Sequence, residues 1–186
     1  LGHAVPQNRE GALLGHVRDI GRSADHPTQR GFQSRDALPY HTDLAADIVG
    51  LLCIHGGREG GDSRLVSAGA VFNALREENE AFAAALCQPV VWDRRGELGP
   101  GDAAWYRFPV FSHHAGHLLT CYIRRFIERT DHLPGAPPRN PLVERAIARV
   151  SALADEPRFH VNMTFEPGDV QIVNNHALLH HRTAYR

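Results

Sequence analysis

The chain has 186 residues, of which 42% are hydrophobic and 22% are charged, and its formal net charge is −1. This composition is typical of a folded domain with a sizeable core. The 20 basic and 21 acidic residues form no long run of one sign, so neither nucleic acid nor an anionic membrane surface is an expected partner. No apolar run approaches the roughly 20 residues of a membrane span, and the first residues do not resemble a signal peptide.

The chain has three cysteines, Cys53, Cys87 and Cys121. A small and odd number of cysteines does not suit a disulfide framework. Such sparse thiols fit a reducing compartment, and we therefore expect a cytoplasmic protein. The chain begins with Leu1 rather than Met, so we expect that residues upstream of it have been trimmed.

The first 30 residues are polar and interrupted by several glycines. They show no sustained periodicity, so we expect an irregular segment that packs on the core. The apolar run at residues 48–54, bounded by glycines, predicts a fully buried strand. A glycine-rich loop is predicted next, at residues 56–61.

Three later stretches have helical features. Ser67 is a candidate N-cap, and apolar residues at helical spacing follow it as far as residue 86. Residues 118–130 also carry apolar side chains spaced for one helical face. Asn140 followed by Pro141 is typical of a helix start and predicts a helix to about residue 154.

Strands are predicted between and after these helices. Residues 89–92 and 106–111 are strand candidates, and Pro109 interrupts the second. The polar loop Arg94–Ala104 between them is a candidate mobile lid. Residues 160–165 and 170–173 alternate polar and apolar around a Pro-Gly pair suited to a type II turn, which predicts a hairpin leading directly to His180. Periodicity alone predicts a mixed α+β domain.

A histidine and an aspartate stand two residues apart at His41 and Asp43. In an extended strand such residues point to the same side, about 6–7 Å apart along the chain, while Thr42 points away. Two imidazoles and one carboxylate on one face of an ion form the facial triad of non-haem Fe(II) oxygenases. The third ligand has to come from another strand, distant in sequence, and His180 meets that requirement.

On its own, H-x-D is a weak motif in a chain with 13 histidines and 21 acidic residues. A polar turn before the apolar run is the simplest structural explanation. His176 and His181 compete with His180 for the third position, and in an extended strand only one of residues 180 and 181 can face the interior. The histidines within residues 113–117 form a second cluster without a carboxylate or thiolate beside them, so a solvated loop is the simpler interpretation there.

The order of several short segments adds context to this motif. Together they resemble the taurine dioxygenase/clavaminate synthase-like family of Fe(II)- and 2-oxoglutarate-dependent oxygenases. The resemblance runs from about Gly31 to Arg186. It is carried by residues 31–33, 37–39, 41–43, 60–63, 166–170, 174–175 and 179–185.

The resemblance implies a mainly β fold with inserted helices, a double-stranded β-helix or jelly roll. It implies a single oxygenase domain over residues 1–186, with an irregular segment at 1–30 and a jelly-roll core at 31–186. In this division the helical insertions lie near residues 67–86, 118–130 and 141–154.

The resemblance also implies that Fe(II) is held by His41, Asp43 and His180, which are then the catalytic residues. In the family a Leu-Leu pair precedes the distal histidine, which selects His180 over His181 and His176. The implied cosubstrates are 2-oxoglutarate and O₂. The implied reaction is decarboxylation of 2-oxoglutarate to succinate and CO₂, coupled to hydroxylation or desaturation of a small organic substrate.

Binding roles follow from the same resemblance. Ser63 matches a hydroxyl that binds the distal carboxylate of 2-oxoglutarate, although a turn serine that satisfies its own backbone is an equal alternative. Substrate specificity is expected around Phe32, Gln33 and Leu38, and in the loop Arg94–Ala104. The identity of the substrate does not follow from the sequence.

The cation that should pair with the distal carboxylate is not evident. In the family an arginine more than ten residues beyond the distal histidine has this role, whereas Arg186 lies only six residues after His180. We expect that this arginine and the final strand lie outside the chain, with Arg182 as the alternative anchor. A missing strand would leave an open sheet edge, which favours association between copies, so a homo-oligomer is a further expectation.

Asn174 and Asn175 precede the distal histidine, where the family usually has Asp-Asn, so Asn174 departs from the pattern. A buried asparagine at this place can satisfy backbone groups, and we favour that structural role.

Two other functions remain as alternatives. One is a non-catalytic jelly-roll binding module, which intact metal ligands disfavour. The other is a zinc hydrolase that uses the same three ligands, although the chain has no H-E-x-x-H pattern.

Overall fold

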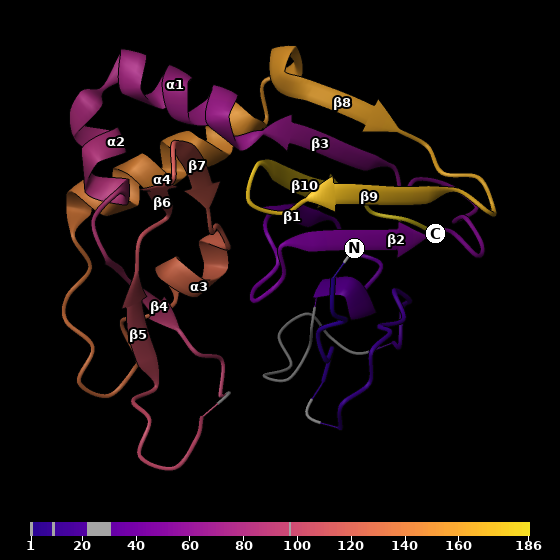
Figure 1. Ribbon diagram of the computed structural model, residues 1–186, viewed down its shortest axis with the longest axis horizontal. Helices are drawn as coiled ribbons and strands as arrows, with labels where there is room; N and C mark the ends of the chain where they lie inside the picture. The colour runs from indigo at the N-terminus through magenta and orange to yellow at the C-terminus, as the bar shows by residue number, and fades with distance from the viewer. Residues whose placement is uncertain (1, 9, 22–30, 97) are drawn as a thin grey trace.

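The computed structural model describes residues 2–8, 10–21, 31–96 and 98–186. In this part of the chain, strands lie toward both ends of the sequence and helices are inserted between them (Figure 1). The architecture is mainly β with inserted helices, as the resemblance implied.

Sheet A contains β1 (Leu38–His41), β3 (Ser63–Ser67), β8 (His160–Met163) and β10 (Leu178–Arg182). It is antiparallel, in the order β1-β10-β3-β8. Strands from opposite ends of the sequence are therefore neighbours (Figure 1). In this register His180 lies opposite His41 on one side and Leu65 on the other. The topology thus brings the H-x-D tripeptide beside the histidines of β10.

Sheet B pairs β2 (Ile48–Leu52) with β9 (Val170–Asn174). Our prediction of a hairpin between residues 160–165 and 170–173 was wrong, because β8 pairs with β3 in sheet A while β9 pairs with β2 in sheet B. The turn between them has the expected form: the Asp169 N–H donates to the Glu166 carbonyl at 3.0 Å, and Gly168 has a φ of +101°. It carries the chain from one sheet to the other.

One face of sheet B is apolar and exposed, and it is called the apolar face below. Ile48 and Leu52 are 43% and 62% exposed, and Val170 and Ile172 on the paired strand are 62% and 54% exposed. The prediction of a fully buried strand at 48–54 was therefore wrong. A short apolar run cannot by itself distinguish a strand covered on both faces from one covered on one face.

We expect the apolar face to make the chain self-associate, because contiguous exposed apolar side chains favour contact between molecules. Replacing the directly opposed Leu52 and Val170 by threonine should shift the sedimentation coefficient toward that of a monomer at concentrations where the parent chain associates. Val161→Thr is the matched control, because Val161 is 59% exposed but lies on β8 in sheet A. Equal association of all three proteins would contradict this expectation.

The helices α1 (Ala68–Glu78), α2 (Glu80–Leu86) and α4 (Pro141–Ala154) pack together beside sheet A (Figure 1). Ser67 caps α1 as predicted, its hydroxyl accepting a backbone N–H of the first turn. The single helix expected over 67–86 is divided at Asn79, whose side chain caps the start of α2. α4 begins after Asn140 as predicted. None of the described helices has the length and apolar character needed to cross a membrane.

The middle of the chain forms two hairpins and a short helix: β4 (Val90–Asp93), β5 (Trp105–Phe108), β6 (Phe111–His114), β7 (His117–Thr120) and α3 (Arg124–Glu128). The helix expected at 118–130 was wrong over its first part, which is β7. Ala115 and Gly116 have φ values of +48° and +81°, typical of the two-residue turn that joins antiparallel strands. Pairing with β6 therefore overrides the local helical spacing. Pro109 separates β5 from β6, as expected.

The core lies between the helices and one face of sheet A. Val66 and Leu179 are opposite each other on β3 and β10, and both are buried in the same cluster as Leu75 of α1 and Val150 of α4. Because strand residues alternate between faces, His180 and Leu65 belong to the other face of sheet A.

The N-terminal segment differs from our expectation. Residues 10–21 are irregular, as predicted, but they are mostly exposed rather than packed on the core. Their backbone makes two bonds with the segment before β1, from the N–H of Arg18 to Phe32 and from that of Ile20 to Gln33. Residues 22–30 lie outside the described part of the chain.

Candidate metal centre

The structure brings His41, Asp43 and His180 together. The Nε2 atom of His41 is 3.9 Å from Asp43 Oδ1, and the Nε2 atom of His180 is 3.8 Å from Asp43 Oδ2. The candidate donor atoms of all three lie within 4.8 Å of one another. Metal–ligand bonds of about 2.1 Å would place neighbouring donors about 3 Å apart, so binding an ion would require these side chains to move together by roughly 1–2 Å.

Each imidazole presents one nitrogen to the centre. The Nδ1 atom of His41 is 2.8 Å from the Pro39 carbonyl oxygen, which can only accept, so Nδ1 carries the proton and Nε2 keeps its lone pair. In His180 the Nδ1 atom is buried without a hydrogen-bond partner among the described residues. A neutral imidazole with a free Nε2 lone pair is the form that binds a divalent ion.

Burial favours that neutral form. Loss of solvent lowers the pKa of His41 from 6.5 to about 4, and the neighbouring His180 lowers it in the same direction. Burial likewise lowers the pKa of His180 to about 4. Both rings are therefore neutral at pH 7, so a metal ion does not have to displace protons from them.

This pKa shift predicts a pH dependence for the metal-free chain. Between pH 6.5 and pH 4 the unfolded histidines bind protons that the folded ones do not, so the free energy of unfolding decreases as the pH falls through this range. From pH 7 to pH 5 the loss should be up to about 2 kcal/mol for each imidazole. Urea unfolding at both pH values measures it. His180→Gln should reduce the pH difference, and an unchanged difference would contradict the assignment.

Asp43 is not in β1, because the strand ends at His41. Its loop is instead held by Asn175, which is 2% exposed. The Asn175 amide oxygen accepts the Asp43 N–H at 2.8 Å, and its NH₂ group donates to the carbonyls of Asp43 at 2.9 Å and Ala46 at 2.7 Å. Asn175 thus has the structural role that we expected of this pair, and it fixes the backbone that carries the carboxylate.

Thr42 anchors the tripeptide from the other side. It is fully buried, its N–H donates to the Tyr122 carbonyl at 2.8 Å, and its hydroxyl accepts the Tyr122 N–H at 2.9 Å. The side chain between the two candidate ligands therefore bonds to the adjoining segment rather than to the centre.

A comparison with family models matches residues 2–186 to the taurine catabolism dioxygenase TauD, TfdA family. The chain belongs to the TauD/TfdA family. FR-33289 synthase of Streptomyces rubellomurinus is 36% identical over 188 residues, covering 100% of this chain and 55% of that protein. A uridine-5′-phosphate dioxygenase of an Amycolatopsis species is 30% identical over 168 residues, covering 86% of this chain and 60% of the relative.

Solved structures show the same fold. An asparagine oxygenase in complex with Fe(II), 2S,3S-3-hydroxyasparagine and succinate superposes with a TM-score of 0.64 at 20% identity, covering 84% of this chain and 47% of that one. The non-haem iron oxygenase OrfP in complex with Fe has a TM-score of 0.59 at 14% identity, covering 82% of this chain and 46% of that one. The chain spans about half the length of the relatives it matches.

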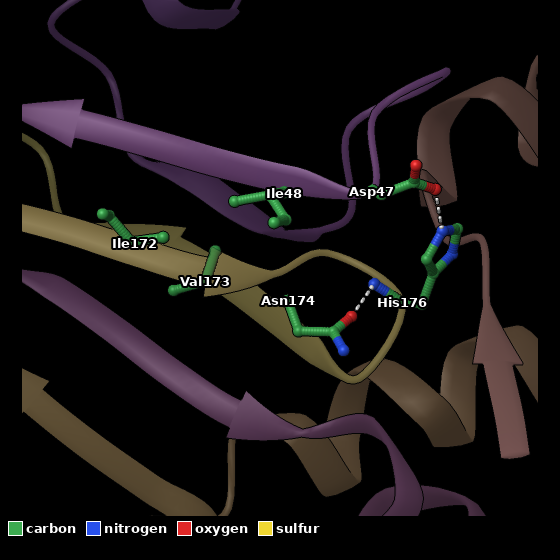
Figure 2. Close-up of a pocket in the computed structure, with 6 residues that line it drawn as sticks. All are labelled: Asp47, Ile48, Ile172, Val173, Asn174 and His176. Atoms are coloured by element: carbon green, nitrogen blue, oxygen red, sulfur yellow. Dashed lines mark hydrogen bonds and ion pairs between the residues drawn. The ribbon is translucent and has the colours of Figure 1, made fainter. Parts of the chain in front are cut away.

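The two rival histidines lie outside the triad. His181 falls on the opposite side of β10 and packs against Tyr40, with 4.9 Å between the ring centroids. The Nε2 atom of His176 is 2.8 Å from Asp47 Oδ1, and its backbone N–H donates to the Asn174 side chain (Figure 2). This pair lies at one end of a shallow cavity of about 290 Å³ on the apolar face (Figure 2).

The second histidine cluster does not form a candidate metal site within the described residues. The histidines of residues 113–117 are exposed around the β6–β7 turn. Within the described residues, these three histidines do not form a group whose donor atoms converge on one point, as those of the candidate centre do. They are exposed to solvent, as expected, but they lie on the paired strands β6 and β7 rather than in the loop that we expected.

Ser63 and Arg182 are opposite each other in the pairing of β3 with β10, two residues from Leu65 and His180 respectively. They therefore share the face of sheet A that carries the centre. The Ser63 hydroxyl accepts a hydrogen bond from the Gln171 side chain of β9 at 3.2 Å, so this face is turned toward sheet B. The family's cosubstrate has two carboxylates, and both residues suit such a group.

Only one of the three guanidinium nitrogens of Arg182 has a hydrogen-bond partner among the described residues. Its Nη2 donates to the carbonyls of Ser34 and Asp36 at 2.6 Å each, while Nε and Nη1 are buried without a partner in the described part of the chain. Burial lowers the pKa of Arg182. Each of these nitrogens could donate to a carboxylate, the usual partner of a buried arginine. They lie on different edges of the guanidinium, however, and the edge that Nε shares with Nη2 is partly occupied by the two backbone carbonyls.

The residues expected to contact substrate lie elsewhere. Phe32 and Gln33 are in a 3-10 turn over Gly31–Gln33, and Leu38 begins β1. They line neither the shallow cavity on the apolar face nor a second cavity, of about 340 Å³, at Asp43. The same holds for the described residues of the loop Arg94–Ala104, which joins β4 to β5. Their roles in substrate binding and as a lid remain predictions.

Proposed function

We propose that this chain is the metal-binding core of an Fe(II)- and 2-oxoglutarate-dependent dioxygenase that oxidises a small organic substrate. The observation that carries the proposal is the convergence of the donor atoms of His41, Asp43 and His180 in a member of the TauD/TfdA family. Two neutral imidazoles and one carboxylate are the donors of the facial triad that leaves positions open for cosubstrate and oxygen.

The fold we propose is a jelly roll whose two layers are sheets A and B. The crossing of the chain between these sheets at the turn around Gly168 supports it, as does the similarity to solved oxygenases. We propose further that residues 1–186 form a single domain, and that the last strand of the second layer lies outside them. The described part of sheet B has only two strands, β2 and β9, which supports an incomplete layer.

When bound, Fe(II) with 2-oxoglutarate and O₂ would supply the oxidising power, and the products would be succinate, CO₂ and a hydroxylated or desaturated substrate. The residues of the chain would supply placement. The Pro39 carbonyl orients the His41 ring, and Asn175 holds the loop of Asp43. The two imidazoles are only 13% and 12% exposed, whereas the Asp43 side chain is 47% exposed, so water is limited on the imidazole side of the centre.

We propose Ser63 as a ligand of the distal carboxylate of 2-oxoglutarate. The cation that pairs with this carboxylate would be either Arg182 or an arginine outside residues 1–186. The donors on Nε and Nη1 of Arg182, which have no hydrogen-bond partner among the described residues, support the first assignment. Its two bonds to backbone carbonyls support a purely structural role instead. A structure with 2-oxoglutarate bound, or the dissociation constant of 2-oxoglutarate for Arg182→Met, distinguishes the two.

The substrate class that we propose is a small polar metabolite. The relatives include a dioxygenase of uridine-5′-phosphate and an oxygenase of asparagine. We also propose a cytoplasmic location, which the free state of all three cysteines supports.

Anaerobic addition of Fe(II) and 2-oxoglutarate tests this function, because the chelate gives a visible charge-transfer band. Succinate release under O₂ measures turnover. Binding of zinc together with absence of turnover would favour a hydrolase that uses the same ligands, and failure to bind any metal would favour a non-catalytic binding module.

We expect hydroxylation or desaturation rather than halogenation. Halogenating relatives replace the carboxylate of H-x-D by a small residue, and the position so opened takes chloride. Asp43 keeps that position filled and supplies the negative charge itself. Mass spectrometry of the products in the presence of chloride tests this expectation, and a chlorinated product from the unmodified protein would contradict it.

A further inference from the structure

A cavity of about 340 Å³ adjoins the candidate centre at Asp43. Asp43 lines it, together with the loop that follows Asp43 as far as Asp47. The opposite wall comes from the middle of the chain, from the end of β5, the β6–β7 hairpin and the residues that follow β7. Within the hairpin, Ser112 and Leu119 are directly opposite each other and both line the cavity. A molecule in this space would therefore lie next to the metal-binding group.

The hydroxyl group of Thr120 is the unusual feature of this cavity. Thr120 lines it and is 3% exposed, and its oxygen is buried without a hydrogen-bond partner among the described residues. The other two threonines buried in the described part of the chain are paired, since Thr42 accepts from Tyr122 and Thr130 donates to Ile127. Because an unpaired buried hydroxyl is costly, a group that bonds to Thr120 from the cavity would remove that cost.

The charges around the cavity exclude one class of bound group. The ionisable side chains that line it are Asp43, Asp47, His176 and Cys121, and burial raises the pKa of the Cys121 thiol to about 11, so that it is neutral. Asp43 belongs to the candidate centre, and Asp47 is paired with His176 at 2.8 Å. No arginine is among the described lining residues. A phosphate, sulfonate or carboxylate placed here would meet two carboxylates and no unpaired cation, which is unfavourable.

The remaining walls are neutral and partly apolar. Phe108 and Leu119 supply apolar surface, and Ser112 adds a hydroxyl group to the wall. Asn175 also lines the cavity, but its amide is already used in holding the loop of Asp43. The hydroxyls of Thr120 and Ser112 are therefore the groups left to recognise a ligand.

We propose that this cavity is the substrate subsite of the enzyme, and that it takes an uncharged, partly apolar portion of the substrate whose hydroxyl, amide or carbonyl group bonds to Thr120. This inference rests on the proposed function, because the cavity can hold a substrate only if the chain is an enzyme. It assigns the residues of this wall as determinants of specificity, and it leaves any anionic group of the substrate outside this cavity.

The test uses three probes that share one ring: toluene, benzyl alcohol and benzyl phosphate. Each is titrated into the metal-free chain while the methyl signals of Ala45, Ala46, Leu119 and Thr120 are followed by NMR. We expect benzyl alcohol to bind about three- to tenfold more tightly than toluene, because one net hydrogen bond changes a dissociation constant by about that factor. Benzyl phosphate should bind more weakly than benzyl alcohol.

Two substitutions separate the effect of the Thr120 hydroxyl on binding from the effect of the cavity's shape. Thr120→Val keeps the shape and removes the oxygen, so it should abolish the preference for benzyl alcohol over toluene. Thr120→Ser keeps the oxygen and should retain most of that preference. Thr164→Val is the control, because Thr164 is bonded to Asp62 and does not line the cavity.

Tighter binding of benzyl phosphate than of benzyl alcohol, no shift at these methyl groups, or an undiminished preference in Thr120→Val would each overturn the proposal. Iron and 2-oxoglutarate are absent from this experiment. A chain that shows the charge-transfer band but fails the probe test would therefore refute the subsite alone, and the reverse result would refute the oxygenase alone.

Discussion

His180→Ala is expected to abolish iron binding, and His41→Ala and Asp43→Ala should have the same effect. Each removes one of the three donors that lie within 4.8 Å of one another. Loss of an outer partner of a ligand costs about 10- to 100-fold in metal affinity, so loss of a ligand itself should cost at least about 100-fold. Anaerobic titration with Fe(II), followed by equilibrium dialysis and metal analysis, measures the affinity of each variant.

His181→Ala is the matched control for this experiment. His181 is the next residue on β10, but it packs against Tyr40 on the opposite side of the sheet. We expect iron affinity close to that of the parent chain, with a small loss of stability from the lost ring contact. Loss of iron in the His181 variant with retention in the His180 variant would show that the register of β10 at the centre is wrong by one residue.

Asn175→Ala is expected to destabilise the fold and to weaken iron binding together. The substitution leaves the N–H of Asp43 and the carbonyls of Asp43 and Ala46 without their partner in a part-buried position. Three lost hydrogen bonds at about 1 kcal/mol each predict a loss of roughly 3 kcal/mol in the free energy of unfolding. Urea denaturation measures that loss, and Fe(II) titration of the folded variant measures the effect on the centre.

Asn174→Ala supplies the comparison within the same turn. Asn174 is exposed, and its side chain accepts one hydrogen bond, from the N–H of His176 (Figure 2). We expect a change of about 1 kcal/mol or less, with iron binding retained. If both variants lost the same stability and the same iron affinity, the turn as a whole rather than the bonds of Asn175 would position Asp43.

Local sequence determined several features of this protein. The Ser67 cap, the start of α4 at Asn140-Pro141 and the turn around Gly168 depend on residues adjacent in sequence, and each has the predicted form. The H-x-D tripeptide and the distal histidine were also recognisable from their order along the chain. The residues that hold a backbone turn or begin a helix act within a few positions, so a single sequence is sufficient to find them.

Other features were decided only by tertiary structure. Residues 117–120 have helical spacing but pair with β6, because strand pairing and burial outweigh local propensity. The sequence of residues 160–163 and 170–174 predicts a hairpin, but the two strands belong to different sheets, because each pairs with a strand that is distant in the sequence. The exposure of the apolar run at residues 48–52 likewise depends on which strands and helices cover it.

The candidate site shows the same division. The sequence supplied the types of the donor groups at His41, Asp43 and His180, whereas the pairing of β1 with β10 determined that they meet. Nothing near Thr120 in the sequence distinguishes it from a core residue, because an unpaired hydroxyl beside a cavity is a property of the surrounding walls. The sequence therefore determined which donor groups are available, and long-range strand pairing determined where in the fold they meet.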